Sequence, residues 1–411
     1  MRILSIHMNS SVNGGAEVVY IHGNRLLAEM GHQVAWLSIG ASQDAVRRGE
    51  LVFYLPEIPD KKIQLIPKLT RHFFNSESVR LAKQAIQEFH PDIVHVHTVF
   101  GYRYLSPSVL LPFKERGIPI VQTLHDYGLI CPASFFLSHG KVCEACKGRM
   151  YYFSAMKCCM GGSFPRSFMA AINSYIKDYA YHYDGLISSY IAPSHFLRQK
   201  YIEFGFSPPK IEVIPNAYFQ TDSTVMPIEI EKKSRNYLLF AGRLSSEKGV
   251  DVLVGASKGL GIPVKIVGDG PERETLQTMQ GRIGADNIEF LGKQPHSSME
   301  TLYKNAALTI FPSRWYENGP LVILESFAQA TPVIASRIGA IPEFVKDCQT
   351  GYLFNVDDPD DLRRTIQLAL RRPHPEVMEE NAYQQVHTEH RQGLYATRLE
   401  NILSRHIAGS H

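Results

Sequence analysis

Residues 307–336 read ALTIFPSRWYENGPLVILESFAQATPVIAS, and this stretch decides the fold class. ALTIFPS (307–313) is an apolar run of strand length, and PVIAS (332–336) is a second one. Between them GPLVILESFAQA (319–330) is helical, with Pro320 suited to its first turn. Two strands joined by a helix form a parallel βαβ unit, so the stretch predicts a parallel sheet covered on both faces.

The same alternation extends outward from this stretch and occurs twice. The first half contains the strand-like runs RILSIH (2–7), QVAWLSI (33–39), DIVHVHT (92–98) and IPIVQTLH (118–125). The second half contains NYLLFAG (236–242), VKIVGD (264–269) and IEFLG (288–292) before the opening stretch. Between the halves, residues 211–236 turn polar and contain prolines.

A chain of 411 residues is long for one core, so two domains are expected. We predict two doubly wound α/β domains, 1–212 and 213–387. A helical segment at 388–411 is predicted to cross back to the first domain. Ligands of such sheets bind beyond the carboxyl ends of the strands, which directs attention to the loops that follow them.

The composition, 44% hydrophobic and 20% charged with a net charge of +3, is that of a soluble globular protein and gives no reason to expect nucleic acid. No window approaches ~20 consecutive apolar residues, the length of a membrane span. The apolar start ends at Asn9, which is too early for a signal peptide. We therefore expect a cytoplasmic protein whose cysteines are thiols or metal ligands rather than disulfides.

Two glutamates flank the predicted helix start. Glu317 lies in the loop after the strand, and Glu325 lies about one and a half turns into the helix. One molecule could contact both carboxylates, which suit the vicinal hydroxyls of a ribose or hexose, with its anionic part near the free N–H groups of the helix start. The alternative makes Glu317 a solvated loop residue and Glu325 a capping or salt-bridge residue.

Three further loops follow strands. LLFAGRLSSEKG (238–249) carries Arg243 and Lys248, which suit a diphosphate, although a solvated basic turn with Glu247 as partner is the alternative. VGDG contains Gly268, which either lets a base or ribose approach the backbone or only permits a tight turn. NGGAE contains Gly15, which allows a bound group to approach a helix start. VDDPDDL (356–362) contains a D-x-D pattern that resembles a metal site, but its position favours a helix cap.

As a set, FAGRLSSEKG, VGDGPER, FPSRWYENGPLVILESFAQATPVIAS and NGGAE resemble the motifs of glycosyltransferase family 4. The resemblance covers the second half nearly continuously and the first half at NGGAE, PDIVHVHT and TLHDYG. It implies the GT-B fold, two Rossmann-like domains facing across a deep cleft. It also implies retaining transfer of a hexose or N-acetylhexosamine from a UDP- or GDP-sugar, without a metal cofactor. The acceptor would be a glycan or a lipid-linked saccharide in cell-surface polysaccharide synthesis.

The resemblance also implies residue roles. Arg243 and Lys248 would neutralise the diphosphate, Glu325 would bind the ribose, and Glu317 would bind the transferred sugar. His125 in TLHDYG matches a histidine near the donor sugar, although a core histidine at a strand end is the alternative. Backbone groups would complete the donor cradle at Asn318, Gly319 and Leu321, with Gly15 close to the phosphates or sugar.

Residues 131–159 form a cysteine-rich insertion in the first domain. Cys131, Cys143, Cys146 and Cys158, which is followed directly by Cys159, give the spacing C-x11-C-x2-C-x11-C and predict a structural zinc site. Reduced, partly buried thiols and an iron–sulfur cluster are the alternatives. Cys348 stands apart and is predicted to be a core residue.

Aromatic and basic residues are also frequent in the insertion, among them Tyr152, Phe153, Arg149 and Lys157. Such a mixture suits peripheral contact with the anionic inner face of a membrane, where a lipid-linked acceptor would lie. The alternative is a solvated loop packed on residues 166–183. Two other function classes stay open, a nucleotide-sugar epimerase and a non-catalytic sugar-binding protein.

Overall fold

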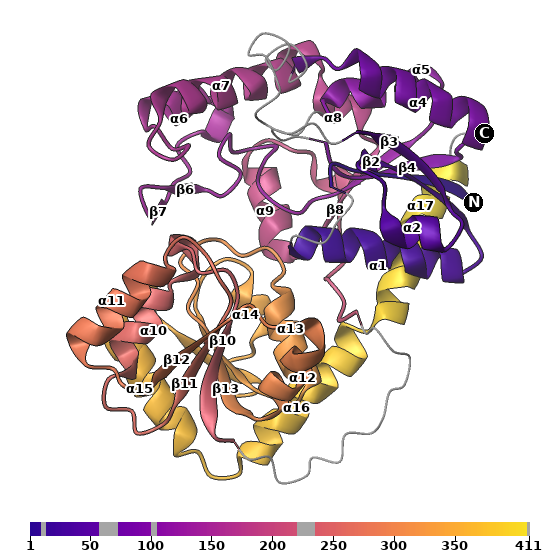
Figure 1. The fold of residues 1–411 in the computed structure, drawn as a ribbon. Coiled ribbons are helices and arrows are strands. Elements are labelled where there is room, and N and C mark those ends of the chain that lie inside the picture. The colour runs from indigo at the N-terminus through magenta and orange to yellow at the C-terminus, as the bar shows by residue number, and fades with distance from the viewer. Residues whose placement is uncertain (10–13, 57–72, 100–104, 220–234, 409–411) are drawn as a thin grey trace. The chain divides into compact units, whose positions relative to one another are not determined.

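The computed structural model describes residues 1–9, 14–56, 73–99, 105–219 and 235–408, and the chain divides into two compact units (Figure 1). Unit 1 comprises Met1–His139, Cys143–Pro215 and Gln392–His411, and unit 2 comprises Gly140–Val142 and Asn216–Arg391. These limits lie within a few residues of the domain limits predicted at 212 and 387. Most of the polar stretch predicted to join the domains, 220–234, lies outside the described residues.

Unit 1 is built on a seven-stranded parallel sheet of order β3-β2-β1-β4-β5-β8-β9. Consecutive residues of β1 and β2 are buried, which requires cover on both faces of the sheet. The strands are β1 (Arg2–His7), β2 (Gln33–Ile39), β3 (Leu51–Leu55), β4 (Ile93–Thr98), β5 (Ile120–Thr123), β8 (Ser189–Ala192) and β9 (Ile211–Val213). β6 (Leu137–Ser138) and β7 (Lys141–Val142) form a separate two-stranded sheet.

The helices of unit 1 include two that are distant in sequence and packed together. His32, just after α1, bonds through Nε2 to Glu400 of α17 at 2.9 Å, and Tyr395 and Leu399 of α17 are buried. The α-helices are α1 (Gly15–Glu29), α2 (Gln43–Arg47), α4 (Ser76–Phe89), α5 (Leu111–Glu115), α6 (Tyr152–Met156), α7 (Phe164–Tyr175), α8 (Tyr183–Leu186), α9 (His195–Glu203) and α17 (Gln392–Ala408). Shorter helical turns are η2 (Pro107–Leu110), η3 (Lys147–Arg149), η5 (Pro208–Lys210) and the π-turn η4 (Ile176–Ala180) that extends α7.

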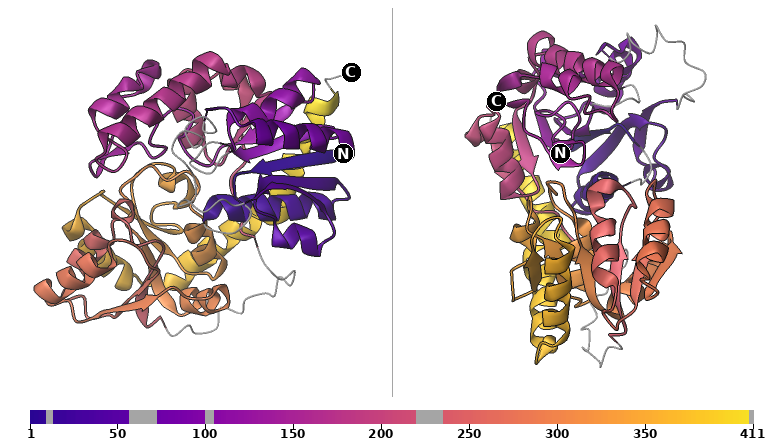
Figure 2. Two further views of the ribbon diagram at one scale, coloured as in Figure 1. Left: turned by 45° about the horizontal axis from the view of Figure 1, so that its top comes forward. Right: turned by 90° about the vertical axis from the view of Figure 1, so that its left-hand side faces the viewer.

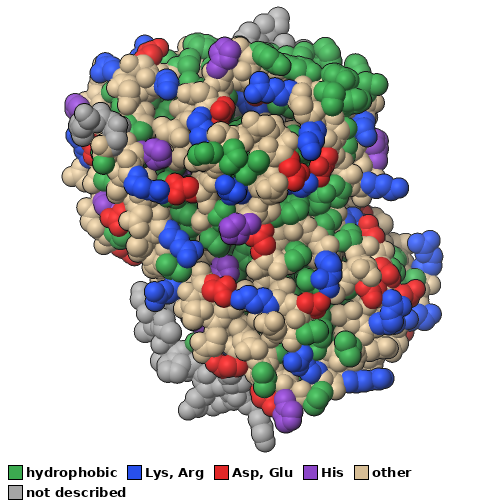
Figure 3. Space-filling model, turned by 180° about the vertical axis from the view of Figure 1, so that it is seen from behind, with side chains coloured by type: hydrophobic (Ala, Val, Ile, Leu, Met, Phe, Trp, Pro, Cys, Tyr) green, Lys and Arg blue, Asp and Glu red, His purple; other side chains and the backbone are tan. Residues whose placement is uncertain are grey.

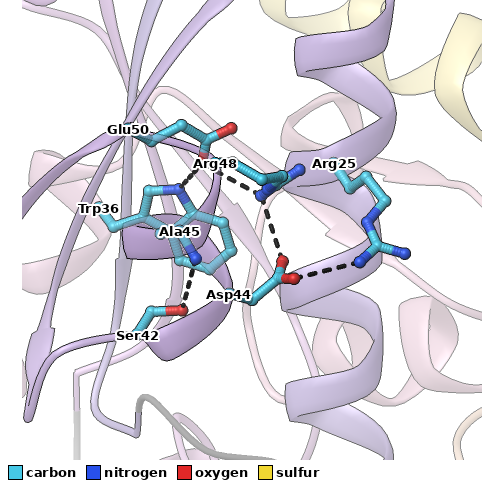
Figure 4. A network of polar contacts seen from close by, with 7 residues as sticks. All are labelled: Arg25, Trp36, Ser42, Asp44, Ala45, Arg48 and Glu50. Atoms are coloured by element: carbon cyan, nitrogen blue, oxygen red, sulfur yellow. Dashed lines mark hydrogen bonds and ion pairs between the residues drawn. The ribbon is translucent and has the colours of Figure 1, made fainter.

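A polar network attaches α2 to its neighbours in unit 1 (Figure 4). Asp44 of α2 pairs with Arg25 of α1 at 3.1 Å and with Arg48 at 3.3 Å. Glu50 accepts hydrogen bonds from Arg48 at 3.1 Å and from the indole of the fully buried Trp36 at 2.5 Å. The network therefore satisfies the one polar atom of a core tryptophan.

Unit 2 is a six-stranded parallel sheet of order β12-β11-β10-β13-β14-β15, and Figure 2 shows helices on both of its faces. Its strands are β10 (Tyr237–Ala241), β11 (Val264–Val267), β12 (Ile288–Gly292), β13 (Ala306–Phe311), β14 (Val333–Ser336) and β15 (Gly351–Phe354). Its helices are η6 (Ser246–Lys248), α10 (Val250–Ser257), α11 (Arg273–Ile283), α12 (His296–Lys304), α13 (Leu321–Ala328), α14 (Ile341–Phe344), α15 (Pro359–Leu370) and α16 (Pro375–Glu389).

Both halves are doubly wound, as predicted, and the predicted strands are present within about two residues of their limits. Three details of the structure correct or refine the sequence predictions. Pro320 is the residue before α13 rather than part of its first turn. The helical segment expected from 388 begins inside α16, and α17 starts only at Gln392. The D-x-D pattern is a helix cap as predicted, because Asp358 Oδ1 accepts a hydrogen bond from Asp361 N at 2.8 Å.

Each sheet reverses its strand order once, between β1 and β4 in unit 1 and between β10 and β13 in unit 2. Loops at the carboxyl ends of these neighbouring strands therefore lie side by side within each unit. Across the described ranges, every helix is too short or too polar to cross a bilayer.

Candidate functional site

The loops after β10 and β13 of unit 2 bring Lys248 to Glu317. Glu317 is 6% exposed, and its Oε1 accepts hydrogen bonds from Lys248 Nζ at 2.8 Å, Ser313 Oγ at 2.9 Å and Trp315 Nε1 at 2.6 Å. Its Oε2 makes no hydrogen bond within the described part of the chain. The carboxylate is held rigidly by one oxygen, which contradicts the solvated alternative for Glu317.

Aromatic rings hold Lys248 from other sides. Its Nζ lies 5.3 Å from the centre of the Trp315 ring and 5.6 Å from that of Phe311. Such cation–π contacts restrict the ammonium group without neutralising it. An ammonium has three donors, so Lys248 retains donors beyond the one that it directs to Glu317.

Arg314 fastens these two loops together and was missed by the sequence analysis. Its guanidinium bonds to Asp357 at 2.7 Å, to Asp251 at 2.9 Å and to the carbonyl of Ser246 at 2.9 Å. Its backbone N–H also donates to the carbonyl of Glu247 at 3.0 Å. Because Ser246 and Glu247 directly precede Lys248, Arg314 fixes the loop that carries Lys248 relative to the loop that carries Glu317.

Two glycines are required by close contact between loops. Gly339 has φ 60°, and a Cβ there would lie 2.7 Å from the backbone nitrogen of Glu317. Gly268 has φ 131°, and a Cβ there would lie 1.8 Å from the carbonyl oxygen of Gly242. Contact between backbones is therefore sufficient to explain Gly268, which supports the tight-turn alternative for that residue.

Arg243 is not among the residues that contact Glu317. It is exposed, and its side chain makes no ion pair or hydrogen bond with the residues that the structure describes. Glu247, the alternative partner for the basic loop, instead accepts a hydrogen bond from Ser245 Oγ at 2.5 Å. The loop after β10 thus presents one exposed guanidinium and one ammonium bound by a carboxylate.

Glu325 lies on the partly exposed face of α13 and has a partner of its own. Tyr303 donates a hydrogen bond to its Oε2 at 2.9 Å, and burial raises the pKa of the Glu325 carboxyl. At the start of the same helix, Asn318 is buried and the carbonyl of Gly319 accepts a hydrogen bond from Asn216 Nδ2 at 2.8 Å. Leu321 is the first residue of α13, whose first N–H groups have no partner within the helix.

The carboxyl ends of β1, β4 and β5 in unit 1 carry four histidines. His97 Nδ1 lies 2.8 Å from His125 Nε2, and the two rings stack with centroids 5.1 Å apart. His95 Nε2 bonds to Thr123 Oγ1 at 2.8 Å, and His7 lies 6.4 Å from the His125 ring. Burial lowers the pKa of His95 and of His125 to about 3 and the pKa of His97 well below its usual value, so these three imidazoles are neutral at pH 7.

The start of α1 places a carboxylate, Glu17, beside these histidines. Glu17 lies 3.5 Å from His7 Nε2 and accepts a hydrogen bond from Asn9 Nδ2 at 2.8 Å. Burial opposes ionisation, but the bonds to His7 and Asn9 prevail and lower the pKa of Glu17 to about 2. Gly15 is the exposed first residue of this helix.

A small polar recess continues from the histidines into unit 1. It is lined in part by His97, Gln122, His125, Asp126 and Tyr201. Asp126 Oδ1 accepts a hydrogen bond from the N–H of Gly128 at 2.7 Å, and burial raises the pKa of its carboxyl. Of this region only His125 was singled out from the sequence. The pattern H-x-H in DIVHVHT, two histidines on one face of an otherwise apolar strand, is the signal that could have identified the rest.

The cysteines are all free thiols. Burial raises the pKa of Cys131 to about 11 and that of Cys146 to about 12, while Cys158 Sγ lies 3.5 Å from the carbonyl of Ala155. No three Cys, His, Asp or Glu side chains among the described residues are gathered closely enough to hold a metal ion. The thiols as arranged, Cys143 included, do not form a zinc ligand set, and the zinc site stays a prediction. Cys348, expected in the core, is exposed.

Comparison with known proteins gives matches along nearly the whole chain. Residues 13–218 match the family described as Glycosyltransferase Family 4, and residues 223–385 match Glycosyl transferases group 1. The D-inositol 3-phosphate glycosyltransferase of Acidothermus cellulolyticus is 31% identical over 295 residues, which cover 65% of this chain and 57% of that protein. The lipopolysaccharide 1,2-N-acetylglucosaminetransferase of Salmonella typhimurium is 32% identical over 182 residues, 39% of this chain and 47% of that protein.

Other curated relatives are matched over 33% to 48% of their own length. Among solved structures, HepE of Anabaena in complex with UDP and glucose superimposes with a TM-score of 0.68 at 18% identity, covering 98% of this chain and 100% of that one. This likeness bears on the fold, and the GT-B prediction of two Rossmann-like, doubly wound domains is confirmed. Because the family 4 match spans about half of the chain and the group 1 match most of the rest, this chain belongs to glycosyltransferase family 4.

Proposed function

We propose that this chain is a retaining glycosyltransferase that moves a hexose or N-acetylhexosamine from a UDP- or GDP-sugar to a glycan or lipid-linked saccharide in the cytoplasm. The observation that carries the proposal is the Glu317 carboxylate at the switch point of unit 2. One of its oxygens is saturated by Lys248, Ser313 and Trp315, and the other makes no hydrogen bond within the described residues. A carboxylate that is fixed through one oxygen and can still accept a hydrogen bond at the other suits a sugar hydroxyl at this position.

The charges around Glu317 suit the leaving group. Breaking the anomeric bond releases a diphosphate, which must be stabilised as its negative charge develops. Arg243 presents a guanidinium with no carboxylate partner in the described chain, and Lys248 retains ammonium donors. We assign both cations to the diphosphate and Glu325, on the adjoining helix, to the ribose hydroxyls.

The remaining assignments follow from the family. Asn318, Gly319 and Leu321 would offer backbone groups at the start of α13, and His125 and Gly15 of unit 1 would contact the donor sugar or its phosphates. UDP in the HepE structure and the lipopolysaccharide acceptor named for the Salmonella relative support a nucleotide-sugar donor and an envelope-polysaccharide context. No step of the proposed transfer uses a metal ion.

The test is a thermal-shift screen against UDP-, GDP- and ADP-sugars, followed by measurement of nucleoside diphosphate release with the donor that binds. We expect one base to stabilise the protein, and we expect Arg243→Ala to lower kcat/KM about 100-fold. Arg364→Ala is the matched control, because Arg364 is an exposed arginine on α15 of the same unit.

Each competing function gives its own result. Conversion of the nucleotide sugar without release of diphosphate would identify an epimerase. Binding of a donor with no turnover against any glycan acceptor, in the wild type as in the variant, would identify a sugar-binding protein.

A further inference from the structure

An exposed aromatic surface lies on α6, α7 and η4 of unit 1. We define it by Tyr152, Met156, Phe164, Phe168 and Tyr179, which are 48%, 69%, 55%, 47% and 59% exposed. In Figure 3 green side chains gather at the upper right of the molecule, over α6 and α7. Five large apolar side chains on one pair of packed helices are more than isolated surface residues, and such a patch marks a binding surface.

The helices beneath the aromatic surface are firmly packed, so its exposure is a property of the fold. Tyr151 donates a hydrogen bond to Asp178 Oδ2 at 2.7 Å, and its ring packs on Tyr175 with centroids 5.2 Å apart. Ser167 Oγ bonds to the carbonyl of Ser163 at 2.8 Å and accepts from the N–H of Met160 at 2.9 Å. The insertion therefore packs on α7, as the alternative for this segment predicted.

Phe164 and Phe168 illustrate how the surface is presented. They are one helical turn apart on α7, and their rings stack with centroids 6.0 Å apart. Both rings are about half exposed, whereas Ser167, Ala171 and Ser174 of the same helix are buried. The helix is thus amphipathic, with aromatic rather than charged residues along part of its outer face.

The charge around the aromatic surface is strongly positive. Residues 141–180 contain six lysines and arginines but only two acids, Glu144 and Asp178. Glu144 is paired with Lys200 at 2.9 Å, and Asp178 with the buried Lys177 at 3.1 Å. The exposed cations Lys147, Arg149, Lys157 and Arg166 therefore have no acid of this segment left to neutralise them, apart from a long 3.6 Å contact between Arg149 and Asp178.

We propose that the aromatic surface binds an anionic lipid bilayer. Aromatic rings partition to the headgroup region, and cations beside them are attracted to anionic headgroups. Since every helix in the described ranges falls short of a membrane span, contact of this kind is interfacial. A protein partner or a second copy is disfavoured, because the exposed lysines and arginines of this segment would lose hydration on burial in an apolar interface. Arg149 is one of them, and its guanidinium carbon lies 5.9 Å from the centre of the Tyr179 ring. The inference does not depend on the donor or on catalysis.

The experiment is flotation of the full chain with vesicles of phosphatidylcholine alone or with 30% phosphatidylglycerol. We expect the chain to float with the anionic vesicles at low salt, at least about tenfold more than with phosphatidylcholine, and to be released at high salt. Phe164→Ser/Phe168→Ser should reduce binding about tenfold or more, and Lys157→Glu/Arg166→Glu should reduce it at least about fivefold per cation.

Leu368→Ser/Leu370→Ser provides the matched control, because these leucines of α15 in unit 2 are 61% and 40% exposed and lie outside the aromatic surface. The control should float as the wild type does, and each variant should keep the circular dichroism spectrum and the cooperative thermal unfolding of the wild type, which shows that it is folded. The proposal is overturned if the wild type does not float, or if the control loses as much binding as the phenylalanine variant. It is also overturned if light scattering shows a dimer that the phenylalanine variant dissolves while vesicle binding is unchanged.

Discussion

The two units place very different chemistry at the same point of the same topology. In unit 1, buried histidines lie at the carboxyl ends of the strands around the switch point, and burial keeps His95, His97 and His125 neutral. His97 is hydrogen-bonded to His125. In unit 2, the equivalent strands lead to an ammonium–carboxylate pair, Lys248 and Glu317, that is only partly shielded from water.

The difference shows that the sheet determines where a site lies, while the residues at the strand ends and in the loops that follow determine its chemistry. Imidazoles remain neutral in unit 1 because burial penalises their charged form. Lys248 is held in unit 2 because the Glu317 carboxylate pairs with its charge and the Trp315 ring restricts its position. Three changes should therefore affect the two units differently: a fall in pH, a substitution that removes the charge of Glu317, and a substitution that removes the hydrogen bond between His97 and His125.

The largest expected effect is selective loss of stability of unit 1 in acid. The pKa of His95 and of His125 is lowered to about 3 in the folded chain, whereas histidine in the unfolded chain has its usual pKa of about 6.5. As the pH falls below about 6.5, the unfolded chain therefore binds protons before the folded chain does, and the folded chain loses stability. Each histidine should then cost about 1.4 kcal/mol of unfolding free energy for each pH unit between those values. In unit 2 the raised pKa of Glu325 has the opposite sign, because the folded chain binds that proton more tightly and gains stability as pH falls.

The chain offers a built-in probe for each unit, since its two tryptophans are Trp36 in unit 1 and Trp315 in unit 2. Trp36→Phe and Trp315→Phe leave one reporter each for urea unfolding between pH 7 and pH 4.5. The midpoint reported by Trp36 should fall more steeply than that reported by Trp315. Equal shifts at both tryptophans would contradict the assignment of neutral histidines to unit 1.

The second effect concerns catalysis at the ion pair of unit 2. Glu317→Gln keeps the size of the side chain but removes the negative charge that binds Lys248, and we expect kcat/KM to fall about 10³-fold. Lys248→Met should cost a similar factor. The double variant should be little worse than either single variant, because the two side chains act as one unit.

Release of nucleoside diphosphate measures this effect, and Glu376→Gln on an exposed turn of α16 is the control. Losses that multiply in the double variant would contradict this coupling and would show that Glu317 and Lys248 act independently.

The strands and the charged loops of unit 2 could be predicted from sequence because both are local patterns. β1 and β2 are continuous apolar runs, and Glu317 and Lys248 each follow such a run directly. Short strands contain too few residues for a recognisable apolar pattern. β9 has three residues and lies at the start of the polar stretch 211–236, which was interpreted as a linker.

Contacts between distant segments were not predictable. Tyr303 reaches Glu325 because α12 packs beside α13, and His97 meets His125 because β4 pairs with β5. Strand pairing and helix packing of this kind join residues that are 22 and 28 positions apart. Nothing in the local sequence specifies the register of that pairing, so single histidines could be noticed but not their hydrogen bond.

The smallest expected effect tests that hydrogen bond. His97 Nε2 is buried and has no partner within the described residues, and a bare lone pair there costs less than a buried N–H. The proton of His97 therefore lies on Nδ1 and is donated to His125 Nε2, which leaves the proton of His125 on its own Nδ1. His97 thereby acts as a positioning residue that fixes the ring and the tautomer of His125.

His97→Phe fills the same space without the donor, and we expect it to lower kcat about 10- to 100-fold with little change in KM. His97→Asn places an amide N–H near the position of Nδ1 and should recover most of the rate. Long-range ¹⁵N–¹H spectra should show His125 protonated at Nδ1 in the wild type and in His97→Asn, and a mixture of tautomers in His97→Phe. If the two variants were equally slow and the His125 tautomer were unchanged, His97 would be a packing residue. The contrast between the units would then rest on burial alone, because the His97–His125 hydrogen bond would have no counterpart to the catalytic role that we propose for Lys248 and Glu317 in unit 2.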